Sequence, residues 1–174
     1  LFKNSISHSV VIFCLVAVLL LVNIFVRNII LVGKCRYFLE HRRYTDTRPD
    51  RILFVYKVGK TGNVAKVMFI RYIRQILWNF TIIGGFIKSY EYSMIPYILA
   101  EDPSIDYKEA FRLSKELTKG EKKRIFGMDL LYFLGFAISS FSYNLISVFF
   151  LNPLKECSYA EIYMTLREVK TDVH

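Results

Sequence analysis

The stretch VVIFCLVAVLLLVNIFV, residues 10–26, decides how the rest of the sequence is interpreted, because it contains one Asn and no charged side chain. Extended to residue 32, it would form a helix about 34 Å long, which exceeds the roughly 30 Å thickness of a bilayer's hydrocarbon core. Basic residues follow it directly. This arrangement is typical of a membrane protein and predicts a first span over residues 10–32.

Composition supports that class and excludes others. The chain has 174 residues, a length that fits one domain, and 53% of them are hydrophobic. Its net charge of +9 is concentrated next to the first span, which explains the charge without nucleic acid. The three cysteines and three histidines have no zinc, redox or metal-ligand spacing, and no Ser/His/Asp set suggests a nucleophile. We therefore expect no cofactor, no metal and no enzymatic activity.

The distribution of charge predicts the topology. Residues 34–74 contain eleven Lys and Arg against three acids, and residues 101–124 contain seven against six. Loops rich in Lys and Arg close to a span are kept on the cytoplasmic side. Both stretches should therefore face the cytoplasm, so the chain between them should double back.

The intervening chain predicts a helical hairpin. Residues 64–83 would rise, Gly84-Gly85 would make the turn, and residues 86–100 would return. The second arm would be only about 22 Å long, which indicates a re-entrant or tilted half-span with Pro96 disturbing its last turn. The alternative is one long span over residues 76–99, with the following loop outside.

Two amphipathic helices are expected on the cytoplasmic side. In the first, residues 51–60, Ile52, Leu53, Val55 and Tyr56 would face lipid while Arg51, Lys57 and Lys60 point outward. In the second, Asp106 is the N-cap with Glu109 as its capping-box partner, and Gly120 ends the helix. The apolar positions of the second helix recur at helical spacing: Ala110, Leu113 and Leu117.

The last apolar region leaves two interpretations open. Residues 125–151 could form one span, or residues 124–138 and 145–166 could form a second hairpin with a kink at Pro153. The predicted fold is an all-α, polytopic transmembrane bundle with helical hairpins, about four to five membrane segments and an amphipathic cytoplasmic helix. Residues 1–174 would be a single integral-membrane domain. Because the sequence starts at Leu1, we expect a further segment before it.

The segment EYSMIPYILAEDPSIDYKEAFRLSKELTKGEKKRIFGMDL, residues 91–130, resembles a bacterial integral-membrane family of unknown function, domain of unknown function 975. The matching positions are Tyr92, Ser93, residues 96–100, Asp102-Pro103, Ser114, Gly120, Lys122 and Asp129-Leu130. Members usually have a Pro-Gly pair at the hairpin tip, where this chain has Gly84-Gly85. The resemblance implies a multi-pass protein of a bacterial plasma membrane, with five or six segments in the full chain. It also implies similarity to the membrane domains of some glycerophosphodiester phosphodiesterases, and no established activity.

Charged residues inside predicted membrane segments are the candidate functional residues, because their burial is costly unless they are paired. They form a candidate intramembrane polar cluster: Arg71, Arg74, Lys88, Glu91 and Asp129. Lys88 and Glu91, at i and i+3, could pair on one helix face. The functional interpretation is a polar cavity or ion path; the alternative is that these side chains neutralise one another and only pack.

The basic block after the first span supplies candidate contacts to lipid headgroups: Lys34, Arg36, Arg42, Arg43, Arg51, Lys57 and Lys60. The same residues could equally serve only to fix the topology. The expected partners are the lipid bilayer, anionic phospholipids, and other membrane subunits or a second copy of the chain. The leading hypothesis is a non-enzymatic transport or export component, or an accessory subunit of a membrane complex. The alternatives are the membrane half of a lipid-headgroup enzyme and a homo-oligomeric channel or immunity-type protein.

Overall fold

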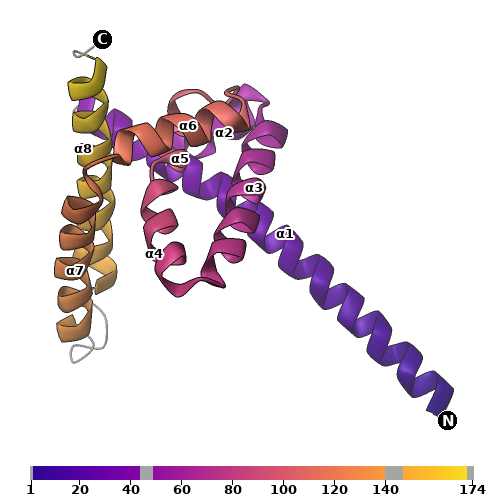
Figure 1. Cartoon of the computed structure of the whole chain (residues 1–174). Helices are drawn as coiled ribbons and strands as arrows, with labels where there is room; N and C mark the ends of the chain where they lie inside the picture. Colours follow the sequence, from indigo (N-terminus) through magenta and orange to yellow (C-terminus); the bar gives the residue numbers. More distant parts are fainter. Residues whose placement is uncertain (1, 44–48, 140–146, 172–174) are drawn as a thin grey trace.

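The structure is a computed structural model that describes residues 2–43, 49–139 and 147–171 (Figure 1). Across these residues every regular element is a helix, so the all-α prediction is confirmed. No helix in the described parts of the chain has both the length and the apolarity that crossing a membrane takes. The polytopic arrangement stays a prediction.

The first helix, α1 (Phe2–Arg43), is a single helix of 42 residues that contains the predicted first span. Its N-terminal half projects away from the other helices (Figure 1) and carries exposed Val11, Leu15 and Leu19. Its C-terminal half lies in the core, where the buried side chains recur every three or four residues on one face: Ile29, Val32, Cys35 and Leu39. One helix therefore has a free half and an anchored half.

The predicted first hairpin is present, but its turn is not where the sequence placed it. Helix α3 (Thr61–Asn79) is followed by Phe80-Thr81, where the chain reverses into α4 (Ile82–Glu91). The prediction of a turn at Gly84-Gly85 was wrong, and so is the alternative of one long helix over residues 76–99. The glycines lie in the first turns of α4, where a Cβ on Gly85 would come within 3.1 Å of Cα of Asn79. They are needed for close approach to the end of α3, not for a turn.

The return arm is also broken. After α4 the chain turns and starts α5 (Ile95–Glu101), with Pro96 in the first turn of the new helix. Proline is tolerated there because the first amides of a helix have no intrahelical acceptor. The expectation that Pro96 disturbs the last turn of a continuous arm was therefore wrong. All side chains from Ile95 to Ala100 are buried, as expected for a helix at the centre of a bundle.

The first predicted amphipathic helix is shorter than expected. A 3-10 helix, η1 (Pro49–Leu53), leads into α2 (Phe54–Val58), which ends at Gly59. Leu53 and Tyr56 are exposed, as expected for lipid-facing residues, but Val55 is completely buried and belongs to the core. The carbonyl of Ile52 lies so close to Gly33 of α1 that any side chain there would overlap it. Packing against the rest of the bundle therefore buries Val55, one of the four residues that the sequence assigned to lipid.

The second predicted amphipathic helix is α6 (Tyr107–Thr118), and its local signals are mostly confirmed. The carboxylate of Asp106 accepts a hydrogen bond from the Lys108 amide at 3.0 Å, as an N-cap does. Glu109 pairs with Arg112 at 2.5 Å, so its carboxylate points along the helix and not back to the cap. Gly120, at φ +90°, follows the end of the helix.

The last region forms a hairpin, so the single-span alternative over residues 125–151 was wrong. Helix α7 (Lys122–Ser139) and helix α8 (Asn152–Thr171) lie antiparallel (Figure 1), and a π-helical turn, η3 (Ser147–Leu151), precedes α8. Pro153 lies in the first turn of α8, directly after the π-helical turn. The expected kink at Pro153 stays a prediction.

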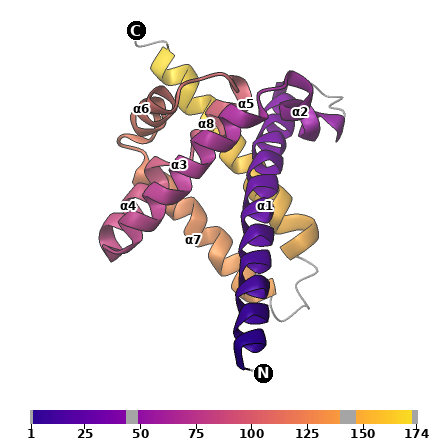
Figure 2. The ribbon, with the colours of Figure 1, turned by 90° about the vertical axis from the view of Figure 1, so that its right-hand side faces the viewer.

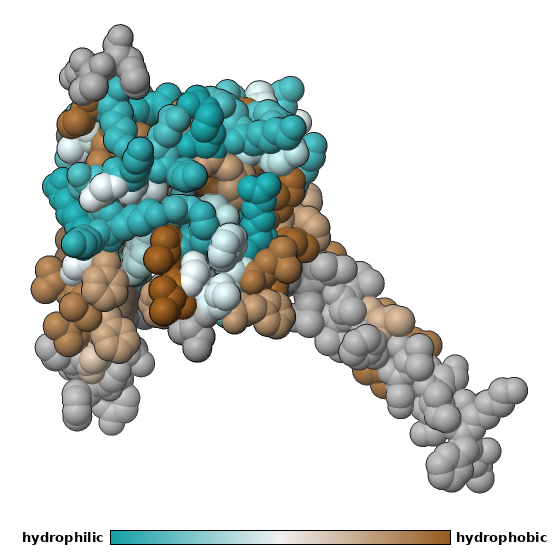
Figure 3. Space-filling view, viewed as in Figure 1, coloured by the Kyte–Doolittle hydropathy of each residue, from teal (hydrophilic) through white to brown (hydrophobic). Residues whose placement is uncertain are grey.

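The surface has an apolar end and a polar end (Figure 3). Hydrophobic residues gather around the lower parts of α4, α7 and α8 in that view, while α6 and the upper end of the molecule are hydrophilic. Figure 2 shows α2 and α6, which lie in the two basic stretches, at the same end, opposite the N-terminus of α1. Between the two basic stretches the chain thus reverses direction, from α3 into α4, as the charge distribution predicted.

Candidate functional site

A cavity of about 280 Å³ lies where α1, α3, α4, α5, α7 and α8 meet. Side chains from all six helices line it, and the ionisable ones among them are Cys35, Arg71, Tyr90, Tyr97, Asp129, Lys155, Glu156 and Tyr159. Of the predicted polar cluster, Arg71 and Asp129 are brought to this cavity.

Arg71 reaches the cavity from the middle of α3. Its Nε–H donates to the backbone carbonyl of Tyr92 at 3.1 Å, in the turn between α4 and α5. That carbonyl also accepts from the Ile95 amide at 3.4 Å, and its second lone pair is available to Arg71. The broken return arm therefore provides the contact that orients the guanidinium.

Asp129 lies on the opposite wall, on α7. It accepts a hydrogen bond from the Tyr159 hydroxyl at 2.7 Å, and its second oxygen lies 2.9 Å from Nζ of Lys155. Both partners come from α8, so the hairpin of α7 and α8 closes around a charge pair. Lys155 thus balances the charge of Asp129, although among the described residues no hydrogen bond reaches the buried Oδ1.

Glu156, one residue after Lys155, forms another pair at the cavity wall. Its carboxylate lies 2.6 Å from Nζ of Lys34 on α1. Cys35, which follows Lys34, is buried in the same wall, and burial together with the nearby Glu156 charge raises the pKa of its thiol to about 12. The thiol is therefore protonated at neutral pH and acts as a small packing group.

The remaining members of the predicted polar cluster lie elsewhere. Glu91 is buried and accepts from Lys88 at 2.5 Å, so the predicted i and i+3 pair is present, and it also accepts from Lys122 of α7 at 2.6 Å. The Ser114 hydroxyl of α6 donates to the Glu91 carbonyl at 2.5 Å. Arg74 is exposed, with its guanidinium 4.5 Å from the centre of the Phe111 ring. These residues connect helices and do not line the cavity.

The predicted headgroup contacts are mostly ion-paired within the chain. Besides Lys34, the pairs join Arg36 and Arg51 to Glu40, Arg42 to Glu161 and Glu168, and Lys57 to Asp50. Lys60 is exposed, and the Arg43 side chain lies outside the described residues. The sequence could not show these pairs, because several join residues more than a hundred positions apart. Their role at a lipid surface stays a prediction.

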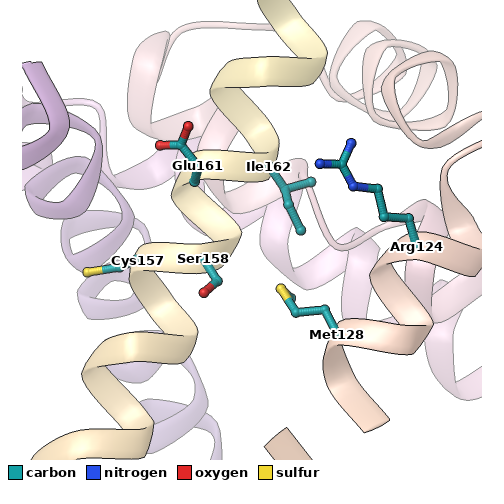
Figure 4. Close-up of a pocket in the computed structure, with 6 residues that line it drawn as sticks. All are labelled: Arg124, Met128, Cys157, Ser158, Glu161 and Ile162. Carbon is teal, nitrogen blue, oxygen red and sulfur yellow. The ribbon is translucent and has the colours of Figure 1, made fainter. Parts of the chain in front are cut away.

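A second cavity, of about 500 Å³, lies between α7 and α8 (Figure 4). Arg124 and Met128 of α7 face Ile162 of α8 across it, whereas Cys157 and Glu161 point away from α7. Over the described residues, no group of three or more His, Cys, Asp or Glu side chains could hold a metal. The 280 Å³ cavity, which charged side chains from α3, α7 and α8 line, is the better candidate site.

The comparison with protein families supports one of the sequence predictions directly. A family model described as "Protein of unknown function (DUF975)" matches residues 50–170, well over half of the chain. The chain belongs to this family. No curated protein and no solved structure matches it. The family description assigns no activity, so membrane insertion and the likeness to phosphodiesterase membrane domains stay predictions.

In this DUF975 chain, four residues that line the cavity were not predicted from the sequence as site residues: Tyr97, Lys155, Glu156 and Tyr159. A signal was present for two of them, because Lys155 and Glu156 fall inside the second arm of the predicted hairpin, residues 145–166. Charges inside a predicted membrane arm are candidates by the same rule that selected Asp129. The tyrosines gave no signal, since a tyrosine within an apolar helix is common as a packing residue.

Proposed function

We propose that the chain is an integral protein of a bacterial plasma membrane and a non-enzymatic transport or export component, alone or as an accessory subunit of a membrane complex. The observation that carries this proposal is a charged cavity surrounded by helices whose outward ends are apolar. Charged groups within such a bundle are costly and are typical of solute and ion pathways.

The apolar ends support insertion into lipid. Large hydrophobic side chains are exposed on the N-terminal half of α1, at the turn between α3 and α4, and along α7 and the start of α8. Phe80 and Ile83 at the hairpin turn are 84% and 77% exposed, and Leu131 on α7 is 71% exposed. Large exposed apolar patches mark membrane or protein interfaces.

The orientation follows from the basic residues. The hydrophilic end contains α2 and α6 with their lysines and arginines, so we place that end in the cytoplasm. The apolar ends of α1, α3–α4 and α7–α8 then enter the bilayer from that side. The cavity, which all of these helices line, would lie at or just below the headgroups.

Membrane insertion is tested by extracting bacterial membranes with alkaline carbonate and by labelling single cysteines in intact cells. In a background with Cys14 and Cys157 replaced by Ser, Lys115→Cys provides a probe on the exposed side of α6. We expect the protein to stay in the carbonate pellet and Lys115→Cys to react with an impermeant reagent only after lysis. Release by carbonate, or labelling in intact cells, would refute the placement.

Transport is tested with the purified chain in liposomes loaded with a mixture of inorganic ions, amino acids and organic acids. We expect at least one charged solute to leave faster than from protein-free vesicles. Asp129→Asn, which breaks the charge pair in the cavity wall, should slow that efflux, while Arg124→Gln, in the second cavity, should not. Equal efflux from protein-free, wild-type and Asp129→Asn vesicles, with no co-purifying membrane protein, would count against the proposal.

A further inference from the structure

We propose that the 280 Å³ cavity binds an oxyanion, the phosphate or carboxylate group of a small solute or of a lipid headgroup, and that Arg71 is the residue that binds it. This inference deepens the proposed function and rests on it, because the bound group would belong to the transported or exported molecule.

Both carboxylates that line the cavity are paired with a lysine, and Arg71 is paired with neither of them. Lys155 pairs with Asp129 at 2.9 Å, and Glu156 pairs with Lys34 at 2.6 Å. Among the residues that the structure describes, no carboxylate forms an ion pair with Arg71. With Lys34, which lies outside the lining, the group contains three cations and two carboxylates, and the cation without a carboxylate partner is the guanidinium of Arg71, where a bound anion would balance it.

The geometry of Arg71 suits an oxyanion. Its Nε–H is used by the Tyr92 carbonyl, which fixes the plane of the guanidinium. Within the described part of the chain, Nη1 and Nη2 have no hydrogen-bond acceptor. These terminal N–H groups match the paired oxygens of a carboxylate or phosphate, and each such charge-assisted bond is stronger than a neutral one.

The dimensions and lining of the cavity limit the ligand. A volume of about 280 Å³ lies just below the range of about 300–1,000 Å³ for sites that take small organic molecules. Ser89 of the same wall adds a hydroxyl donor, whereas the Ser93 hydroxyl already donates its proton to the Tyr90 carbonyl at 2.7 Å and has none left for an anion. The fit is to a small anion or to one headgroup, rather than to a nucleotide.

The test measures the melting temperature of the purified full chain in a neutral detergent. Sodium phosphate and sodium acetate are each compared with sodium chloride at equal ionic strength, and phosphatidylglycerol is compared with diacylglycerol in mixed micelles. We expect at least one oxyanion to raise the melting temperature by about 3–6 °C at ten times its dissociation constant. A shift with a salt alone identifies a soluble anion, and a shift with phosphatidylglycerol alone identifies a lipid.

The variants connect the effect to one side chain. Arg71→Gln should abolish the shift, whereas Arg74→Gln, on the same helix but over the Phe111 ring, should retain it. If Arg71→Gln does not fold, Arg71→Lys decides: it keeps the charge but loses the fork, so its shift should be smaller than that of the wild type. No shift with any oxyanion, an undiminished shift in Arg71→Gln, or a full shift in Arg71→Lys would overturn the proposal.

These outcomes are separable from those that test the proposed function. A chain that remains in carbonate-washed membranes and moves a solute, but shows no oxyanion shift, would overturn only the assignment to Arg71. A chain that carbonate releases would overturn the membrane proposal, whatever the melting temperatures show.

Discussion

The close contact between α1 and η1 gives the sharpest prediction. In the variant Gly33→Ala, the added Cβ would overlap the carbonyl oxygen of Ile52 and would lie 2.7 Å from its carbonyl carbon. Ordinary contact begins at about 3.4 Å, and the obstacle is backbone that cannot rotate away as a side chain would. The 3-10 helix must therefore shift as a unit.

The expected free-energy change has two opposing parts. Ala in place of Gly inside a helix ordinarily stabilises by about 1 kcal/mol. Overpacking a filled interior costs about 1–3 kcal/mol, and a shift of η1 also disturbs buried Phe54 and Val55 and the pair between Arg51 and Glu40. We expect Gly33→Ala to lower the free energy of unfolding by about 1–2 kcal/mol in total.

The matched control is Gly127→Ala on α7. Nothing lies within 4 Å of a Cβ added at Gly127, so only the helix-propensity gain remains and this variant should be as stable as the wild type or more so. Stability is measured by denaturant unfolding in a mild detergent, followed by circular dichroism. If both glycine variants changed stability by the same amount in the same direction, the close approach of η1 to α1 would be refuted.

Three further predictions concern the polar end of the molecule. Asp106→Ala removes the side-chain acceptor of the Lys108 amide and should cost about 1 kcal/mol in denaturant unfolding, whereas Asp106→Asn should cost little. The hydrogen bond from Arg112 holds the pKa of Glu109 below its usual value. The pair therefore stabilises the folded state at pH values above the ordinary glutamate pKa. This stabilisation is lost as the pH falls through the lowered pKa that Glu109 has in the folded state. Arg112→Gln should therefore flatten the acid limb of a stability-against-pH curve, and an unchanged limb would contradict the pairing. Glu91→Ala leaves the ammonium of Lys122 without its acceptor at 2.6 Å and should destabilise the fold by about 2–4 kcal/mol. Glu91→Gln should destabilise it less. Equal melting temperatures for the two variants would refute this account.

Local signals in the sequence predicted local structure well. The N-cap at Asp106 and the stop at Gly120 each depend on backbone geometry within a few residues, and both are present. The reversal between the two basic stretches was also predictable, because it follows from a count of charges. Family membership was predictable from the motifs of residues 91–130.

Features that depend on distant residues were not predictable. The turn at Phe80-Thr81 replaced the one expected at Gly84-Gly85, because close packing of α3 and α4 decided where glycine was needed. Val55 was assigned to lipid because nothing in its neighbourhood shows that α1 covers it. The same reason hid the partner of Lys34, which lies on the last helix.

The cavity illustrates both cases. Arg71 and Asp129 could be selected one by one, because a charge within an apolar stretch is unusual wherever it occurs. Asp129 is paired with Lys155 because α7 and α8 lie side by side, and Arg71 has no carboxylate partner among the described residues. The sequence pattern does not show which charged residues pair in this way.

The C-terminal half of α1 is fixed to the bundle, whereas its N-terminal half projects from it. The carbonyl of Ile52 packs against Gly33, and Lys34 and Arg42 form ion pairs with α8. From Gly33 the helix continues without interruption back to Phe2. At 1.5 Å per residue, a tilt of about 5° at Gly33 displaces the far end by about 4 Å. A movement of the α7–α8 hairpin that tilted α1 by a few degrees would therefore displace the N-terminus of α1 by several ångströms.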